Sequence, residues 1–143
     1  MRISQVSIFV ENKSGKLAEI TTILGNAGIS IRAMSLSDTS EFGILRMVVD
    51  DPQRAKRLLK DGGYAVSQTD VIAVQIRDQP GSLGALLSTL ADAGQNVAYI
   101  YAFIQKHAES AVMILKLNDP DRAIETLRAN GIEPLAAEEV ARM

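Results

Sequence analysis

The chain has 143 residues, 47% hydrophobic and 22% charged, with a formal net charge of −2 and no cysteine, which suits a globular protein and argues against disorder. The absence of a basic run argues against nucleic-acid binding, and the absence of cysteine excludes disulfides, thiolate nucleophiles and cysteine metal sites. Because no apolar run approaches the roughly 20 residues that span a bilayer and the N-terminus lacks a leader pattern, we expect a cytoplasmic protein without membrane contact.

The first half of the chain alternates strand and helix patterns. Val6, Ile8 and Val10 share one face of the first strand, Gly28 suits a left-handed cap after the first helix, and Pro52 suits the first turn of the second helix. The expected elements are a strand over 3–10, a helix over 15–26, strands over 30–37 and 43–50 joined by a turn at 38–41, a helix that begins at 51–52 and ends at 62–63, and a strand over 64–68.

The second half repeats the first at a spacing of 66 residues, as Gly15 and Gly81 illustrate. It predicts strands near 71–77, 96–104, 110–117 and 134–139, with helices near 82–93 and 120–129. This order is the α+β, ferredoxin-like βαββαβ pattern, an antiparallel sheet with both helices on one face. We therefore expect two modules, 1–68 and 69–143, that pack as a pseudo-dimer because residues 67–70 leave almost no linker.

The strand over 96–104 is apolar on both sides. Strict alternation places Val97, Tyr99, Tyr101 and Phe103 on one face and Ala98, Ile100, Ala102 and Ile104 on the other. We expect this strand to be buried on both faces. Since that much apolar surface exceeds what a one-sided sheet covers, we also expect a homodimer.

Signals for catalysis are weak. His107 is the only histidine, and its polar surroundings favour a solvated loop position. One histidine and no cysteine cannot build a metal site of those residues, the pattern does not identify a Ser-His-Asp set around His107, and no phosphate-binding glycine motif is present. An acylphosphatase-like enzyme would need an arginine within the loop after the first strand, and neither Asn12-Lys13-Ser14-Gly15 nor Asp78-Gln79-Pro80-Gly81 supplies one.

The loop between the first strand and the first helix of each half is the best candidate site. It reads Glu11-Asn12-Lys13-Ser14-Gly15-Lys16-Leu17 and Arg77-Asp78-Gln79-Pro80-Gly81-Ser82-Leu83. Glycine lets the backbone approach a ligand, the first helical N–H groups favour a carboxylate, and Asn12 or Asp78 could accept from an ammonium group. An α-amino acid fits these features. The alternative is that Asn12 and Asp78 only cap a helix and the glycines only turn the chain.

These loops, with Ala27-Gly28 and Ala93-Gly94 after the helices, resemble the ACT domain, a regulatory module of amino-acid biosynthetic enzymes. The resemblance covers almost the whole chain as two tandem modules. It implies a non-catalytic, cofactor-free regulatory protein that binds a small ligand, an amino acid, between its modules and transmits ligand occupancy to a partner or to its own oligomeric state. The alternative is an interaction module whose ligand sites have decayed.

In serine-binding members of that family, an asparagine in the loop and another at the start of the second strand reach the ligand from opposite sides of an interface. The resemblance implies a first site that joins the first loop to the second repeat, and a second site with the converse pairing. The histidine that some members carry two residues before the loop asparagine is absent, since Val10 and Ile76 occupy those places. The first site comprises Asn12, Lys13, Ser14, Gly15, Lys16, Leu17 and Asn96, and the second comprises Asp78, Gln79, Pro80, Gly81, Ser82, Leu83 and Ser30.

Overall fold

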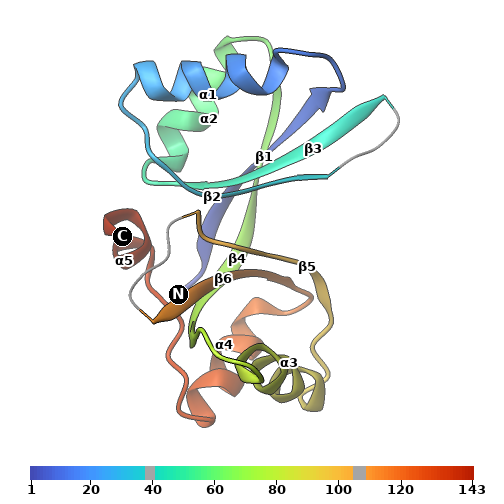
Figure 1. Ribbon diagram of the computed structural model, residues 1–143, viewed down its shortest axis with the longest axis vertical. Coiled ribbons are helices and arrows are strands. Elements are labelled where there is room, and N and C mark those ends of the chain that lie inside the picture. Colours follow the sequence, from blue (N-terminus) through green and yellow to red (C-terminus); the bar gives the residue numbers. More distant parts are fainter. Residues whose placement is uncertain (38–40, 105–108) are drawn as a thin grey trace. The chain divides into compact units, whose positions relative to one another are not determined.

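The computed structural model describes residues 1–37, 41–104 and 109–143. The predicted turn at 38–41 therefore falls mostly outside the described residues, and so does His107. The chain divides into two compact units, one of residues 4–69 and one of residues 1–3 with 70–143. Figure 1 gives the element labels used below.

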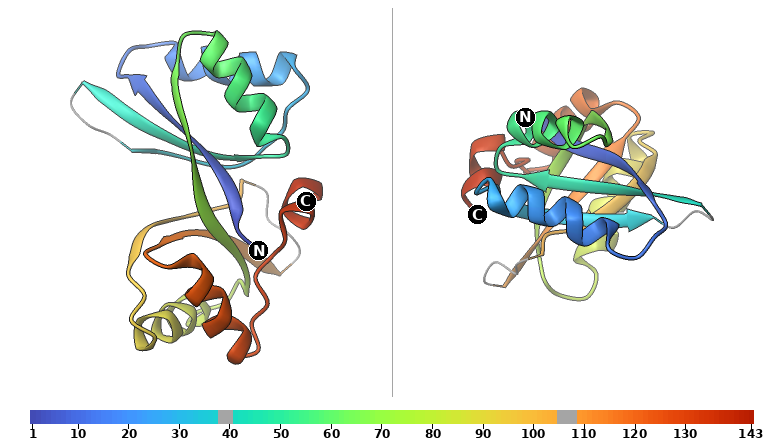
Figure 2. Two further views of the ribbon diagram at one scale, coloured as in Figure 1. Left: turned by 180° about the vertical axis from the view of Figure 1, so that it is seen from behind. Right: turned by 90° about the horizontal axis from the view of Figure 1, so that it is seen from above.

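The unit of residues 4–69 contains a four-stranded antiparallel arrangement with two helices on one face (Figures 1 and 2). Its strand order is β2-β3-β1-β4. Val6, Ile8 and Val10 pack with Ile20 and Leu24 in its core, so the alternation read from the first strand is confirmed. The elements are β1 (Ile3–Glu11), α1 (Lys16–Asn26), β2 (Ile31–Ser37), β3 (Phe42–Val49), α2 (Pro52–Asp61) and the start of β4 (Ala65–Arg77).

The second unit repeats this plan with strand order β4-β6-β5. Asp51 and Asp119 each accept a hydrogen bond at 3.2 Å from the backbone N–H three residues on, at the start of α2 and α4, and a proline follows each aspartate. The strands predicted over 64–68 and 71–77 are one strand, β4. The remaining elements are α3 (Ser82–Asp92), β5 (Val97–Ala102), β6 (Ser110–Leu117), α4 (Pro120–Ala129) and α5 (Ala137–Arg142).

The strand predicted over 134–139 is wrong. Leu135 donates one backbone hydrogen bond to the Ala73 carbonyl at 2.9 Å, but the residues that follow form α5. Pro134 has no N–H to give to a ladder, and the helix formers Ala-Glu-Glu follow it. The Glu139 carboxylate accepts the Ala136 N–H at 3.1 Å, which satisfies one of the free donors at the start of the helix.

The expectation for the strand over 96–104 is wrong in two respects. The pairing of β5 with β6 shifts by one residue between Val97 and Tyr99, and this bulge turns Val97 toward the same core as Ile100. Strict alternation had put these two residues on opposite faces. Burial on both faces also fails, because Ala98 and Ala102 are exposed and Ile104 is 61% exposed.

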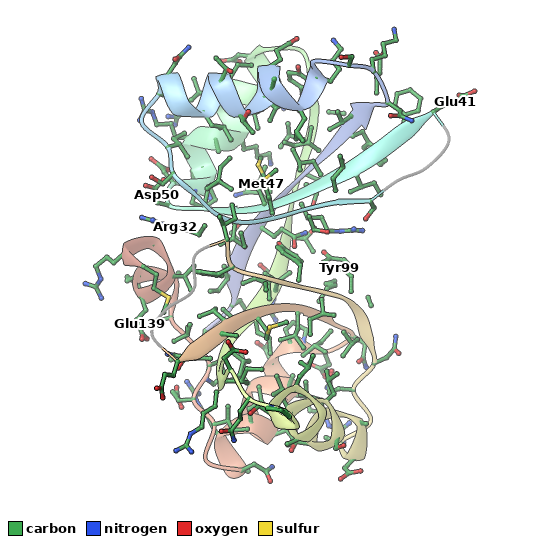
Figure 3. The ribbon with its side chains drawn as sticks, in the orientation of Figure 1. Arg32, Glu41, Met47, Asp50, Tyr99 and Glu139 are labelled. Atoms are coloured by element: carbon green, nitrogen blue, oxygen red, sulfur yellow. The ribbon has the colours of Figure 1, made fainter. Side chains whose placement is uncertain are left out.

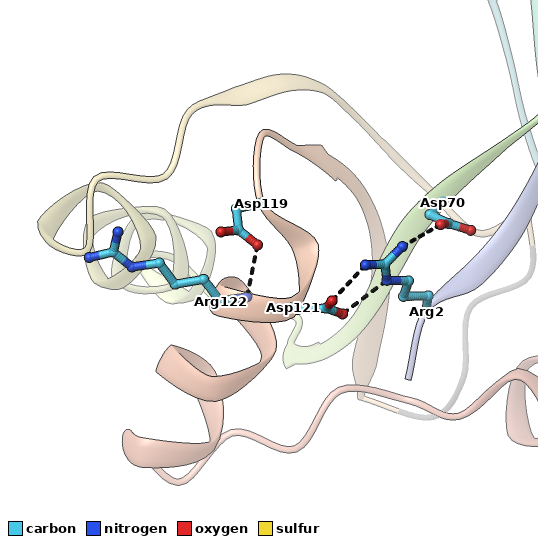
Figure 4. Close-up of polar contacts among 5 residues, drawn as sticks. All are labelled: Arg2, Asp70, Asp119, Asp121 and Arg122. Atoms are coloured by element: carbon cyan, nitrogen blue, oxygen red, sulfur yellow. Dashed lines mark hydrogen bonds and ion pairs between the residues drawn. The ribbon is translucent and has the colours of Figure 1, made fainter.

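The first residues of the chain are held by an ion-pair cluster. Arg2 donates to both carboxylate oxygens of Asp121, at 2.9 Å from Nε and 2.6 Å from Nη2, and to Asp70 at 2.6 Å from Nη1 (Figure 4). Asp121 lies in the first turn of α4. The cluster links Arg2 to β4 and α4 of the second unit, to which residues 1–3 belong although they precede the first repeat in the sequence.

Candidate functional site

The two predicted loops have the same backbone conformation. Gly15 and Gly81 precede α1 and α3 with φ of 88° and 91°, a left-handed conformation that glycine adopts without strain. In the first loop, the Asn12 N–H donates to the Glu41 carbonyl at 3.0 Å; Figure 3 labels Glu41, just before β3. In the second loop, the Asp78 N–H donates to the Glu109 carbonyl at 2.8 Å. Each loop is therefore held by the residue just before a neighbouring strand. This strand is β3, which pairs with β1, for the first loop, and β6, which pairs with β4, for the second.

A pocket of about 250 Å³ opens beside the first loop. Four of the predicted residues line it, namely Asn12, Lys13, Lys16 and Leu17, whereas Ser14 and Gly15 are not among its lining residues. Sequence reasoning missed the other walls, which come from the end of β1, the end of β2 and the start of β3. These additional lining residues are Val10, Glu11, Leu36, Ser37 and Gly43.

Gly43 allows two walls of this pocket to come close. A Cβ atom at this position would lie 2.8 Å from the Ser37 carbonyl oxygen and 3.2 Å from Cδ1 of Leu36, and the first of these distances is too short for any other residue without movement. Gly43 pairs with Val10 across β1 and β3, and the corresponding pair in the second repeat is Ala111 with Ile76. The glycine is therefore specific to the first repeat.

Charged groups beside the first loop form local pairs. Lys13 Nζ lies 2.9 Å from Glu11 Oε2, and Lys16 Nζ lies 4.0 Å from Glu19 Oε2. The hydrogen bond from Lys13 is the main cause that holds the pKa of the Glu11 carboxyl below its ordinary value. Glu11 is therefore ionised at neutral pH. All these side chains reach solvent, so a bound anion could draw either lysine away at small cost.

Glu19 has a second partner in Tyr64. The Tyr64 hydroxyl donates to Glu19 Oε1 at 2.6 Å. Burial, with a further contribution from this carboxylate, raises the pKa of Tyr64 to about 12. The phenol therefore stays protonated at neutral pH and remains a donor to Glu19.

The second loop contributes fewer of its residues to the neighbouring cavity than the first loop does. A groove of about 290 Å³ lies beside α3, and among the predicted residues only Ser82 lines it. Asp78, Gln79, Pro80, Gly81 and Leu83 are exposed. The other lining residues come from β4, α3 and the segment after α4, and they are Gln75, Ile76, Arg77, Ala85, Leu86, Thr89 and Ile132.

Ser30 and Asn96 occupy matching places just before β2 and β5. The Ser30 N–H donates to Asp50 Oδ1 at 3.1 Å, and the Asn96 N–H donates to Asn118 Oδ1 at 2.7 Å. Figure 3 labels Asp50, at the end of β3. These bonds use the backbone of Ser30 and Asn96. The predicted role of the two side chains in ligand binding stays a prediction.

Over the described ranges, no three histidine, cysteine, aspartate or glutamate side chains gather in a way that could hold a metal ion. In the same residues, no helix has the length and apolar character needed to cross a membrane.

Comparison with known proteins identifies relatives of the whole chain. A family model described as an ACT domain pair matches residues 1–143. The crystal structure of protein BT0572 from Bacteroides thetaiotaomicron is 34% identical, with a TM-score of 0.94 over 100% of this chain and 98% of that one. The ligand-free regulatory subunit of aspartate kinase from Thermus thermophilus shares the fold, with a TM-score of 0.66 at 14% identity over 88% of this chain and 91% of that one.

A curated relative is an enzyme of greater length. D-3-phosphoglycerate dehydrogenase from Methanocaldococcus jannaschii is 27% identical over 126 residues, which are 85% of this chain and 24% of the dehydrogenase. The chain thus spans about a quarter of the length of this relative.

Proposed function

Because the chain belongs to the ACT domain pair family, we propose that it is a non-catalytic regulatory protein whose first repeat binds an α-amino acid. The observation that carries the proposal is the pocket beside the first loop, which is lined both by the polar residues Asn12, Lys13 and Lys16 and by the apolar residues Val10, Leu17 and Leu36. A free amino acid likewise combines charged and apolar groups. The repeated ACT-like motif in both halves of the sequence supports the same class of ligand.

Each part of an amino acid has a partner among the lining residues. Lys16 and the first N–H groups of α1 suit the carboxylate, because ammonium groups and helix N-termini both attract anions. The Asn12 side-chain carbonyl and the Glu11 carboxylate suit the ammonium group. Val10, Leu17 and Leu36 leave room for an apolar side chain. The proposed contribution of Asn96 from across a module interface rests on the family resemblance alone.

The second candidate is an assembly module with decayed ligand sites, and a homodimer in the cytoplasm is part of both proposals. Ala98, Ala102 and Ile104, in and beside β5, are exposed, and exposed apolar surface of this kind favours a protein contact. Light scattering tests the dimer. A mass that stays at the 15.4 kDa of one chain at all concentrations would contradict it.

A thermal-shift screen against the common amino acids tests the binding proposal. A ligand at 100 times its dissociation constant adds about 2.7 kcal/mol to the free energy of unfolding, which is readily seen as a higher melting temperature. The screen includes 3-phosphoglycerate, because the dehydrogenase relative is named for it and its anionic groups also suit two lysines. We expect at least one amino acid to stabilise the protein and Lys16→Met to remove that effect. No shift with any amino acid at millimolar concentration would favour the assembly module.

A further inference from the structure

A second cavity of the first repeat, of about 270 Å³, combines aromatic rings with carboxylates. It lies within the unit of residues 4–69 and shares only Glu11 and Lys16 with the proposed amino-acid pocket. We call it the aromatic groove and define it by Phe9, Glu11, Lys16, Glu19, Phe42 and Tyr64.

The two phenyl rings extend from one side of the sheet. Phe42 pairs directly with Glu11 across β1 and β3, and Phe9 and Glu11 are two residues apart on β1, so the three side chains lie on the same face. Phe9 and Phe42 are 60% and 48% exposed. Their ring faces are therefore available to a binding partner.

The polar part of the groove offers carboxylates to a cation. Glu11 and Glu19 contribute two negative charges and Lys16 one positive charge, and Lys16 Nζ lies 4.0 Å from Glu19 Oε2. Glu19 is held by the Tyr64 hydroxyl at 2.6 Å, and Glu11 is paired with Lys13 at 2.9 Å. An ionised carboxylate offers about four lone-pair sites, so both glutamates keep acceptor positions beyond these contacts.

We propose that the aromatic groove binds the guanidinium group of an arginine side chain presented by a partner protein. A guanidinium is planar, stacks on aromatic rings, donates to carboxylates in a fork and is weakly hydrated. The groove supplies rings and carboxylates together. A protein is the expected source because the exposed phenyl rings add apolar surface around the cation, and arginine and aromatic residues are enriched at protein interfaces.

The second repeat provides a matched control within the same chain. At the positions equivalent to Phe9, Glu11 and Glu19 it has Gln75, Arg77 and Ala85, which line the groove beside α3 together with Ile132 in place of Tyr64. The described residues that line this groove include no aromatic ring and no carboxylate, and they include an arginine, Arg77. It should repel the cation that the first repeat binds.

The test is a titration of the full chain with N-acetyl-arginine-N-methylamide, followed by chemical-shift changes in two-dimensional amide NMR spectra. We expect saturable shifts with a millimolar dissociation constant around Phe9, Glu19 and Tyr64, and none around Gln75 and Ala85. The uncharged citrulline analogue of the same shape serves as the control and should cause no saturable shift. Equal shifts with both compounds, or shifts confined to the second repeat, would overturn the proposal.

Three variants separate this site from the amino-acid pocket. Phe9→Leu keeps an apolar side chain and should weaken arginine binding about 2- to 5-fold, the range expected for an exposed cation–π contact, and Glu19→Gln should weaken it by a similar factor. Lys16→Met removes a competing cation and should strengthen it about 2- to 5-fold, although it should weaken amino-acid binding. If Lys16→Met weakens arginine binding, or Phe9→Leu leaves it unchanged, the groove is not the site. Failure of the amino-acid screen alone would leave this proposal standing.

Discussion

The loops that follow β1 and β4 share a backbone but differ in side chains. Gly15 and Gly81 have φ within a few degrees of each other, and the second residue of each loop, Asn12 or Asp78, donates an equivalent backbone hydrogen bond to the residue just before β3 or β6. In contrast, Lys13 and Lys16 of the first loop correspond to Gln79 and Ser82 in the second. The fold therefore constrains the glycine and the backbone contacts, whereas the side chains that could select a ligand have diverged.

The largest effect should come from the shared core. Leu24 and Leu90 occupy equivalent positions on α1 and α3, and both are fully buried. Leu24→Ala and Leu90→Ala should each lower the free energy of unfolding by about 2–5 kcal/mol, because each leaves a cavity in a packed core. Denaturant unfolding measures both. A loss below about 1 kcal/mol for either one would show that the two cores are not equivalent.

The sequence predicted the first elements well because their signals are local. Alternation in β1, the glycine before α1 and the Asp-Pro pair before α2 each lie within a few residues of the element they define. The bulge in β5 could not be predicted, because a register shift depends on pairing with β6. The helix α5 was missed because the repeat led us to expect a strand, although Pro134 and the following Ala-Glu-Glu favour a helix.

Part of the candidate site could also be predicted because its residues lie close together in the sequence. Asn12, Lys13, Lys16 and Leu17 belong to one continuous motif, and the structure brings them to one pocket. In contrast, Leu36, Ser37 and Gly43 belong to strands β2 and β3 and lie more than 18 residues after Leu17, the last residue of the loop. The sequence does show that the first repeat has Gly43 where the second has Ala111. This difference points to the pocket only when the close contact of Gly43 with the end of β2 is known.

Substitutions assigned to the two candidate sites should differ more in their effect on ligand affinity than the matched core substitutions differ in their effect on the free energy of unfolding. Loss of a hydrogen bond to a charged group costs about 1.5–3 kcal/mol, or about 10- to 150-fold in affinity. Asn12→Ala and Asn96→Ala should each weaken binding of the stabilising amino acid by that factor, and Asp78→Ala and Ser30→Ala should matter less. Calorimetry on the four variants measures this. A ligand that tolerates loss of both asparagines but not of Asp78 would assign the functional site to the second loop.

The helix caps should behave alike in the two repeats. Asp51 and Asp119 each accept a backbone N–H at 3.2 Å at the start of a helix. Asp51→Ala and Asp119→Ala should each cost about 1 kcal/mol of unfolding free energy, since each leaves a helical N–H without its acceptor. Replacement by asparagine, which also caps, should restore most of the loss. Different costs in the two repeats would show that the surroundings of the cap outweigh the local motif.

The smallest effect should come from a contact within the unit of residues 1–3 and 70–143, the cluster of Arg2 with Asp70 and Asp121 (Figure 4). Its side chains are exposed, so Arg2→Ala should destabilise the protein less than loss of a cap, and salt should reduce the difference.

The hydrogen bond from Arg2 lowers the pKa of Asp121. A carboxyl with a lowered folded-state pKa stabilises the fold above its unfolded pKa, roughly 3.9 for aspartate, and loses this contribution as pH falls through the folded value. The difference between Arg2→Ala and the parent chain should therefore be constant from pH 5 to pH 8 and shrink below pH 4, and Asp121→Asn should abolish most of that pH dependence. A difference that survives both low pH and high salt would mean that Arg2 acts through packing of its side chain instead of its charge.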